Sequence, residues 1–295
     1  MKPFLSLWRC WLPLVLMPVH LVVIGGGAFF LPGLGLLTCI VFGLVLFQLS
    51  RQWILRFVAH TWCFRTERHG EVVFHYAPSL EGHCDLPALA KQVWAANEDL
   101  GEDFGLVLPK IVVFLLDRPE PIQRVLRRPA FGFAIVQCSA IVISNADNVK
   151  EAVRHELAHL FAARWSGTAP PLFGEGLAVW LQGTWYRWHI DDAARQVLRH
   201  WRPRLSSLRN RRLFFSGRHC HECYVLAGSF TGFLIRRYGW DAYRRFYRTS
   251  DALNFNRYFR KVFGVSFDKA EWQWRTELDV MAALGSRVRR NAFQE

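Results

Sequence analysis

The sequence predicts an α+β domain that follows an apolar N-terminal segment. Three observations support this prediction. The first 50 of the 295 residues are nearly free of charge, residues 71–144 contain several runs typical of strands, and the pattern from Asp147 onward is helical. Strands followed by helices are typical of an α+β architecture. Because 52% of the residues are hydrophobic, the composition excludes a disordered protein.

The N-terminal segment has the composition of membrane-spanning helices. No charged residue occurs between Trp11 and Leu49, which is too long for one straight helix across a hydrocarbon core of about 30 Å. Pro32 and Gly33 would break a helix near the middle. We therefore expect residues 1–50 to form a transmembrane hairpin with spans at about 11–31 and 34–50. A single uncleaved anchor and a cleaved signal peptide are the alternatives.

Basic residues flank this segment on both sides. Lys2 and Arg9 precede it, Arg51 and Arg56 follow it, and the turn between the two spans has no charge. The positive-inside rule then places both ends, and with them the C-terminal domain, in the cytoplasm. The seven cysteines form no regular framework, which agrees with a reducing compartment. The sequence thus predicts an integral membrane protein with the lipid bilayer as a partner.

The formal net charge of +13 allows two interpretations. The basic groups can form a solvated surface, or they can attract the domain to anionic lipid. No nucleic-acid-binding motif accompanies the charge, so we expect no nucleic-acid partner.

The expected elements beyond the membrane segment follow from local patterns. Residues 51–70 are interpreted as an amphipathic interfacial connector. Strands are expected at Glu71–Ala77 and Lys110–Leu116, with one or two further pieces in Phe131–Ser144. A helix is expected from an Asp85 cap through Asp99.

The run His155-Glu156-Leu157-Ala158-His159 is an H-E-x-x-H sequence on an expected helix. Val153, Leu157 and Phe161 repeat at helical spacing, so the two histidines lie one turn apart on another face. Imidazoles so placed can bind one Zn²⁺, and Glu156 beside them can act as general base.

A catalytic zinc site needs a third protein ligand. Pro170, Pro171 and Gly174 indicate a loop, after which Glu175 is expected to open a second helix. This helix can return antiparallel to the first and bring Glu175 to the metal. His155, His159 and Glu175 are therefore the predicted ligands of one catalytic zinc ion.

The H-E-x-x-H run followed by Gly174-Glu175-Gly176-Leu177-Ala178 resembles the gluzincin metallopeptidases, in particular peptidase MA-like domains. The runs Tyr224–Phe230 and Phe263–Phe267 resemble later parts of that family, so the likeness covers roughly residues 70–285. It implies a zincin-like peptidase domain over residues 71–295, with a small N-terminal mixed sheet and a mostly helical C-terminal part. Many relatives carry an acidic residue where this chain has Val179, so the carboxylate that would orient a ligand imidazole is not evident there.

The resemblance also implies a substrate strand and an oxyanion donor. Cys138–Ser144 is the candidate edge strand for pairing with an extended peptide, and a buried strand without an open edge is its alternative. Tyr224 is the first candidate to stabilise the oxyanion, with His219 and His221 as alternatives. Cys220 and Cys223 have the spacing of half a structural zinc site, of a redox pair, or of ordinary helix-start residues.

Together these features predict a membrane-anchored zinc peptidase that hydrolyses a peptide or protein substrate. A catalytically silent zinc-binding scaffold of the same fold and a regulatory membrane protein without metal are the two alternative functions.

Overall fold

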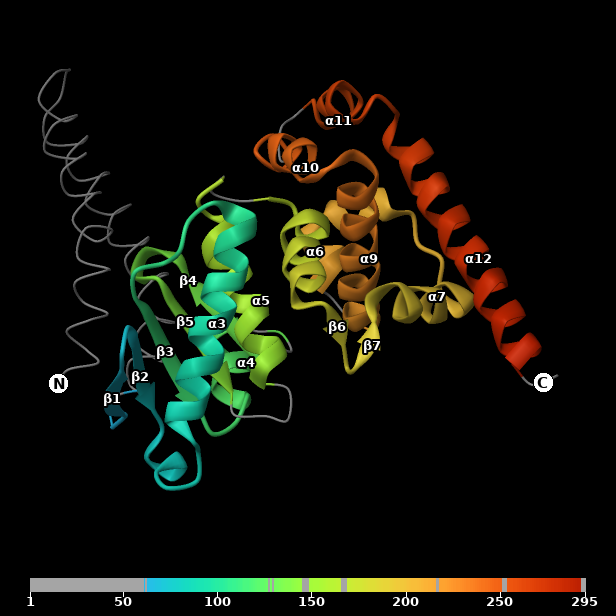
Figure 1. Ribbon diagram of the computed structural model, residues 1–295. Coiled ribbons are helices and arrows are strands. Elements are labelled where there is room, and N and C mark those ends of the chain that lie inside the picture. Colours follow the sequence, from blue (N-terminus) through green and yellow to red (C-terminus); the bar gives the residue numbers. More distant parts are fainter. Residues whose placement is uncertain are drawn as a thin grey trace, which may run out of the picture. The chain divides into compact units, whose positions relative to one another are not determined.

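The computed structural model describes residues 61, 63–126, 128, 130–144, 149–165, 169–215, 218–250 and 254–292 (Figure 1). By its internal contacts the chain divides into a sheet unit, residues 61–95 and 108–149, and a helical unit, residues 96–107 and 150–292. The predicted transmembrane hairpin and residues 51–60 of the connector lie outside the described residues. Within the described ranges, no helix has the length and apolarity needed to cross a membrane.

The sheet unit contains a five-stranded mixed sheet of order β1-β2-β3-β5-β4. Its strands are β1 (Arg65–His69), β2 (Val72–Tyr76), β3 (Ile111–Leu116), β4 (Gly132–Ile135) and β5 (Ala140–Ser144). β2, β3 and β5 are parallel, whereas β1 and β4 are antiparallel to their neighbours. The strands expected at Glu71–Ala77 and Lys110–Leu116 are confirmed, and Phe131–Ser144 forms two strands.

Two expectations about this sheet are wrong. Residues 65–69 were assigned to the interfacial connector but form strand β1, which pairs with β2. The side chains of β1 are polar and mostly exposed, so the sequence shows no hydrophobic alternation there. Cys138–Ser144, the candidate substrate strand, is not an edge. Its strand β5 is buried along its length and pairs with β3 and β4, so β4 occupies the edge position.

Helices complete the sheet unit. They are η1 (Pro78–Leu80), α3 (Leu86–Phe104), α4 (Glu120–Leu126) and η2 (Val136–Cys138), and α3 continues into the helical unit. The expected Asp85 cap is confirmed, because the backbone N–H of Ala88 donates to Asp85 Oδ1 at 2.9 Å. The helix then runs five residues beyond the expected end at Asp99.

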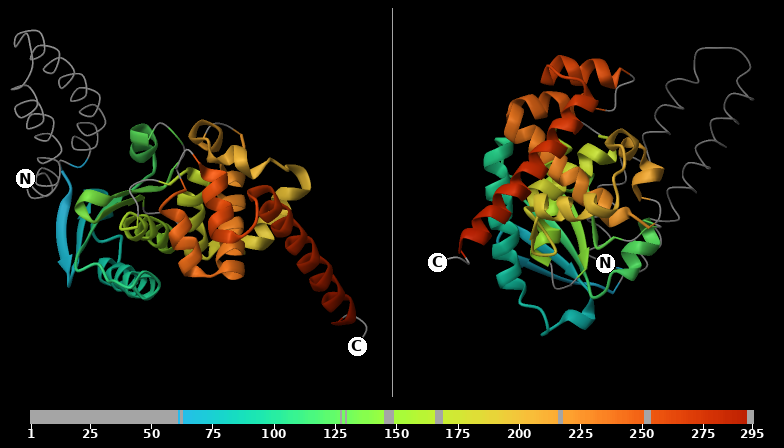
Figure 2. Two further views of the ribbon diagram at one scale, coloured as in Figure 1. Left: turned by 90° about the horizontal axis from the view of Figure 1, so that it is seen from above. Right: turned by 90° about the vertical axis from the view of Figure 1, so that its right-hand side faces the viewer.

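The helical unit follows from residue 150 (Figures 1 and 2). Its elements are α5 (Val149–Ala162), α6 (Pro171–Gln182), β6 (Thr184–Trp185), β7 (Trp188–His189), α7 (Ile190–His200), η3 (Leu205–Arg209), α8 (Arg211–Phe215), α9 (Cys220–Tyr238), α10 (Trp240–Tyr247), α11 (Phe255–Phe263) and α12 (Phe267–Ala292). The region is mostly helical as predicted, but the hairpin β6–β7 was not expected. Its turn residues Tyr186 and Arg187 have φ of 48° and 69°, as a type I′ turn requires, without the glycine or asparagine that usually marks one.

Helices α6 and α9 lie side by side and pack closely through glycines (Figure 1). A Cβ atom on Gly176 would lie 2.6 Å from Thr231 Oγ1, and one on Gly228 would lie 2.4 Å from Val179 Cγ1. Both separations are well below van der Waals contact, so a larger residue at either position forces the helices apart. The position of α6 therefore depends on these two glycines.

A buried polar network joins α7, α9 and α12. The Asp191 carboxylate, 3% exposed, accepts a hydrogen bond from Ser229 Oγ at 2.7 Å and forms an ion pair with Arg236 at 3.0 Å. The indole N–H of Trp274 donates to the same Ser229 hydroxyl at 2.9 Å. Because the buried carboxylate has both a hydrogen-bond donor and a cation, its desolvation is compensated.

Candidate metal centre

Helix α5 carries the H-E-x-x-H run as predicted. Its apolar face, which includes Val153, Leu157 and Phe161, is buried in the core. The rings of His155 and His159 lie on another face, 5.0 Å apart between centroids and nearly perpendicular. The helical period thus fixes the two imidazoles one turn apart.

Helix α6 brings the third donor. The helix begins at Pro171, four residues earlier than expected, so Glu175 lies in its second turn and not at its first residue. The reason is that proline suits the first turn of a helix, where its missing N–H is not needed. The segment of Pro171 to Gly174 that suggested a loop is therefore helical.

The three predicted ligands converge. Glu175 Oε2 lies 3.3 Å from Nε2 of His155 and 3.3 Å from Nε2 of His159. One donor atom from each of the three residues falls within 4.8 Å of the others, and this is the single such group of His, Cys, Asp and Glu within the residues that the structure describes. Two imidazoles and a carboxylate are one of the donor sets of catalytic zinc, so the residues present fit a divalent metal.

The electrostatics of this group also suit a cation. The side chains of His155 and Glu175 are 13% and 12% exposed, and that of His159 is 25% exposed. Burial alone would raise the pKa of the Glu175 carboxyl, but the charge of His159 and hydrogen bonds from both histidines outweigh burial and hold that pKa well below its usual range. The carboxylate is thus kept ionised in an enclosed site. A divalent cation bound there would take the place of the imidazole protons that face Glu175.

Gln182 contacts Nδ1 of His155, the ring nitrogen that does not face Glu175. Its Oε1 lies 3.1 Å from His155 Nδ1, while its Nε2 donates to the carbonyl oxygen of Thr184 at 2.8 Å and faces a carboxylate oxygen of Glu151 at 3.5 Å. Thr184 O and the carboxylate are acceptors only, so they fix the orientation of the amide. His155 Nδ1 must then be the donor to Oε1, which leaves Nε2 as the nitrogen that can bind a metal once the proton it shares with Glu175 is displaced.

Sequence reasoning missed this role of Gln182. The position where relatives carry an acidic residue holds Val179, which is fully buried and packs against Gly228, so no carboxylate fits there. Gln182 lies seven residues after Glu175, which is two helical turns and therefore the same face of α6. That spacing was the available signal.

A second residue near the centre was also missed. The hydroxyl of Tyr247 on α10 lies 3.8 Å from where a Cβ on Gly174 would stand. Burial, and then the charge of Glu175, raise the pKa of Tyr247, so its phenol stays protonated beside that carboxylate. No motif in the sequence marks this contact, because it depends on how α10 packs against α6.

The predicted base Glu156 is adjacent to His155 in α5 and is 5% exposed. Helix geometry turns its side chain about 100° from that of His155.

Of the three candidate oxyanion donors, Tyr224 is the one whose ring lies beside His155, at 6.2 Å between centroids. It stacks on Trp185 of the β6–β7 hairpin at 5.7 Å. His219 instead stacks on Trp201 at 4.5 Å, and His221 lies beside Trp185 at 6.1 Å. The aromatic contacts therefore favour Tyr224.

Cys220 and Cys223 are both buried, and neither forms a disulfide bond. Burial, with the nearby groups of Cys220 and Glu222, raises the pKa of Cys223 to about 12. A thiol so hard to ionise is a poor metal ligand and a poor nucleophile. Cys223 thus has the properties of an apolar packing residue in the first turn of α9.

Comparison with known proteins finds no family model and no curated protein that matches this chain. The resemblance to gluzincins accordingly rests on the residues quoted above.

Proposed function

We propose that this chain is a zinc-dependent peptidase of the gluzincin type. In this proposal a zincin-like domain in the cytoplasm is attached to the membrane by a transmembrane hairpin in residues 1–50. The observation that supports it best is the convergence of His155, His159 and Glu175 from two helices, with Glu156 adjacent.

His155 and His159 would hold the metal through Nε2, and Glu175 would hold it through a carboxylate oxygen. When bound, zinc supplies Lewis acidity, which polarises the scissile carbonyl and acidifies the attacking water. The hydrogen bond from His155 Nδ1 to Gln182 supports this role, because it keeps a proton on Nδ1 and so makes Nε2 the nitrogen that would bind the metal.

Glu156 is the general base of the proposed reaction. It accepts a proton from the water as the oxygen adds to the carbonyl carbon. The C–N bond then breaks, and Glu156 returns the proton to the leaving nitrogen. Water is thereby divided between the new carboxyl and amino ends of the peptide.

Tyr224 is the proposed donor to the oxyanion. Its phenol can donate to the carbonyl oxygen as negative charge develops there. Trp185, which stacks on the Tyr224 ring, would limit the motion of the phenol and so prepare it for this contact.

The test is the full-length chain in detergent as wild type and as Glu156→Gln, incubated with an unfolded protein substrate. New N-termini measured by mass spectrometry should appear with wild type and should be reduced by at least about 10³-fold in the variant. Zinc content should stay equal, since Glu156 is not a ligand. Equal turnover in both proteins would remove Glu156 from the mechanism.

A hydroxamate inhibitor distinguishes the silent scaffold from the enzyme. Hydroxamates bind zinc through an open coordination position, which a catalytic site keeps and a structural site lacks. We expect the hydroxamate to stabilise wild-type protein against heat, and to lose this effect in His155→Ala. Zinc without hydroxamate binding and without turnover would favour the scaffold.

A further inference from the structure

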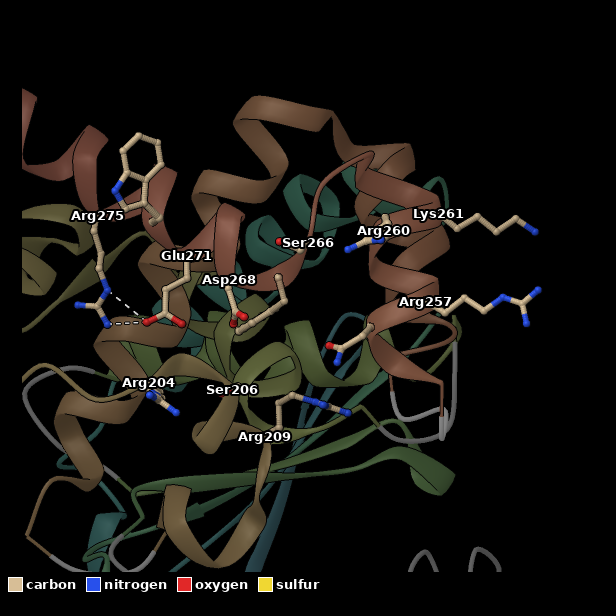
Figure 3. Close-up of a pocket in the computed structure, with 13 residues that line it drawn as sticks. Arg204, Ser206, Arg209, Arg257, Arg260, Lys261, Ser266, Asp268, Glu271 and Arg275 are labelled. Atoms are coloured by element: carbon tan, nitrogen blue, oxygen red, sulfur yellow. Dashed lines mark hydrogen bonds and ion pairs between the residues drawn. The ribbon is translucent and has the colours of Figure 1, made fainter.

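A hollow of about 1210 Å³ lies in the helical unit between η3, α11 and the first turns of α12 (Figure 3). None of the residues of the metal centre lines it. The hollow is therefore separate from the site of the proposed peptidase reaction.

The lining of this hollow is strongly basic. Its cationic side chains are Arg204, Arg209, Arg257, Arg260, Lys261 and Arg275, and its acidic ones are Asp268 and Glu271. Figure 3 shows that Arg257 and Lys261 extend from α11 away from the other labelled side chains, so they add positive charge at the rim.

One acidic group is already neutralised. Glu271 pairs with Arg275 at 2.7 Å and also accepts the backbone N–H of Leu205 at 3.1 Å, as the dashed lines of Figure 3 show for the ion pair. Asp268 is then the remaining carboxylate against five cationic side chains. The excess charge of the hollow is therefore positive, and it favours an anion.

Arg209 provides a second, independent observation. Its guanidinium lies over the ring of Phe255, 3.4 Å from the ring centroid. Across the part of the chain that the structure describes, Arg209 Nε is the one buried side-chain nitrogen or oxygen without a hydrogen-bond partner. A buried donor left unpaired costs about 1–3 kcal/mol, so an acceptor is expected at this place.

The first turn of α12 faces the same hollow, since Ser266, Phe267 and Asp268 all line it. The N-terminus of a helix carries a partial positive charge and favours anions. Trp272, which lines the hollow and is 64% exposed, adds an apolar surface. The hollow thus combines fixed positive charge with a place for an organic group.

We propose that this hollow binds an organic ligand through a phosphate group. Arginine guanidinium groups match phosphate oxygens in pairs, and Arg209 and Arg260 are the cations that we expect to contact them. The volume exceeds that of a single phosphate ion several-fold, which leaves room for an organic body beside Trp272. The phosphate belongs either to a lipid headgroup or to a soluble organic phosphate.

The test uses the full-length chain in neutral detergent and calorimetric titration with three probes. These are inorganic pyrophosphate, dioctanoyl phosphatidic acid, and dioctanoyl phosphatidylcholine as the zwitterionic control. Because pyrophosphate also chelates zinc, the titrations are repeated in a His155→Ala background, which leaves the hollow intact.

Three variants in the hollow should change the affinity for the anionic probes, two of them lowering it and one raising it. Arg209→Gln and Arg260→Gln should each weaken binding of the anionic probes by about 10- to 100-fold. Asp268→Asn removes the opposing carboxylate and should tighten binding by about three- to tenfold. Arg245→Gln, an exposed arginine on α10 outside the hollow, is the matched control and should leave binding unchanged.

The relative affinities for the two anionic probes distinguish a lipid headgroup from a soluble organic phosphate. Tighter binding of phosphatidic acid than of pyrophosphate, lost in Arg260→Gln, would assign a lipid headgroup, and the reverse order would assign a soluble phosphate. If Arg209→Gln fails to fold, Arg260→Gln and Asp268→Asn still decide, because both residues are exposed. Binding that is absent for both anionic probes, or that is the same in wild type, Arg260→Gln and Asp268→Asn, would overturn the proposal.

Discussion

Replacing Gln182 by leucine tests whether the amide orients the metal-binding ring of His155. Leucine has nearly the same volume but neither accepts from Nδ1 nor donates to Thr184. The 3.1 Å contact from His155 Nδ1 to Gln182 Oε1 is then lost, and with it the acceptor that holds the proton on Nδ1. We therefore expect part of the population to carry the proton on Nε2, where it blocks the metal.

The expected magnitude follows from the type of contact. Loss of a partner behind a ligating imidazole weakens metal binding by about 10- to 100-fold, which is about 1.4–2.7 kcal/mol. The free energy of unfolding of the metal-free protein should fall by only about 1 kcal/mol, since one ordinary hydrogen-bonded amide is lost. The effect on metal affinity should therefore exceed the effect on stability.

The assay is competition for zinc between the full-length chain and a chromophoric chelator at fixed pH. Gln196→Leu, an exposed glutamine on α7, is the matched control and should bind zinc as wild type does. A dissociation constant for zinc in Gln182→Leu within about twofold of wild type would refute the role assigned to the amide. An equal loss in Gln196→Leu would point to a general effect of removing glutamine.

Three further predictions concern packing, pH and the oxyanion. Gly176→Ala should cost about 1–3 kcal/mol of unfolding free energy and weaken zinc binding, because its Cβ meets α9 at 2.6 Å. Gly174→Ala, whose nearest neighbour is 3.5 Å away, should be neutral or stabilising by up to about 1 kcal/mol; equal denaturation midpoints for the two variants would contradict the packing argument. Burial, and then the charge of Lys110, lower the pKa of His75 from 6.5 to about 4, so the unfolded chain binds the proton first and stability should fall by up to about 3 kcal/mol as pH drops from 6.5 to 4. In His75→Gln the dependence of stability on pH over this window should shrink by that amount, and an unchanged dependence would exclude His75 as its source. Tyr224→Phe should lower kcat by about 10²- to 10³-fold with little change in KM, whereas an unchanged kcat would leave His219 and His221 as the candidate donors.

The donor residues could be predicted because their chemistry is local. His155, Glu156 and His159 belong to one helical turn, and Glu175 follows at a spacing that permits an antiparallel return. Gln182 was harder to predict, since its contact with His155 joins two helices across 27 positions of the sequence. The pairing of distant residues in a packed interface leaves no pattern in a single sequence.

The missed strands have separate physical causes. Strand β1 is polar and is held by backbone pairing with β2, so its side chains carry no alternating pattern. The β6–β7 turn uses Tyr186 and Arg187 at positive φ, where glycine or asparagine is usual. The buried runs of β3 and β5 were predictable as strands, but their order in the sheet was not, because order depends on long-range pairing.

The zinc content of the folded full-length chain shows whether His155, His159 and Glu175 form a metal site. It is measured by mass spectrometry on wild type, on Glu175→Ala, and on Glu222→Ala as a control for the cysteine and histidine residues at the start of α9. We expect about one zinc per chain in wild type and in Glu222→Ala, and loss of that zinc in Glu175→Ala. Zinc held equally by Glu175→Ala, or folded wild-type protein that holds no metal when zinc is supplied, would contradict this expectation.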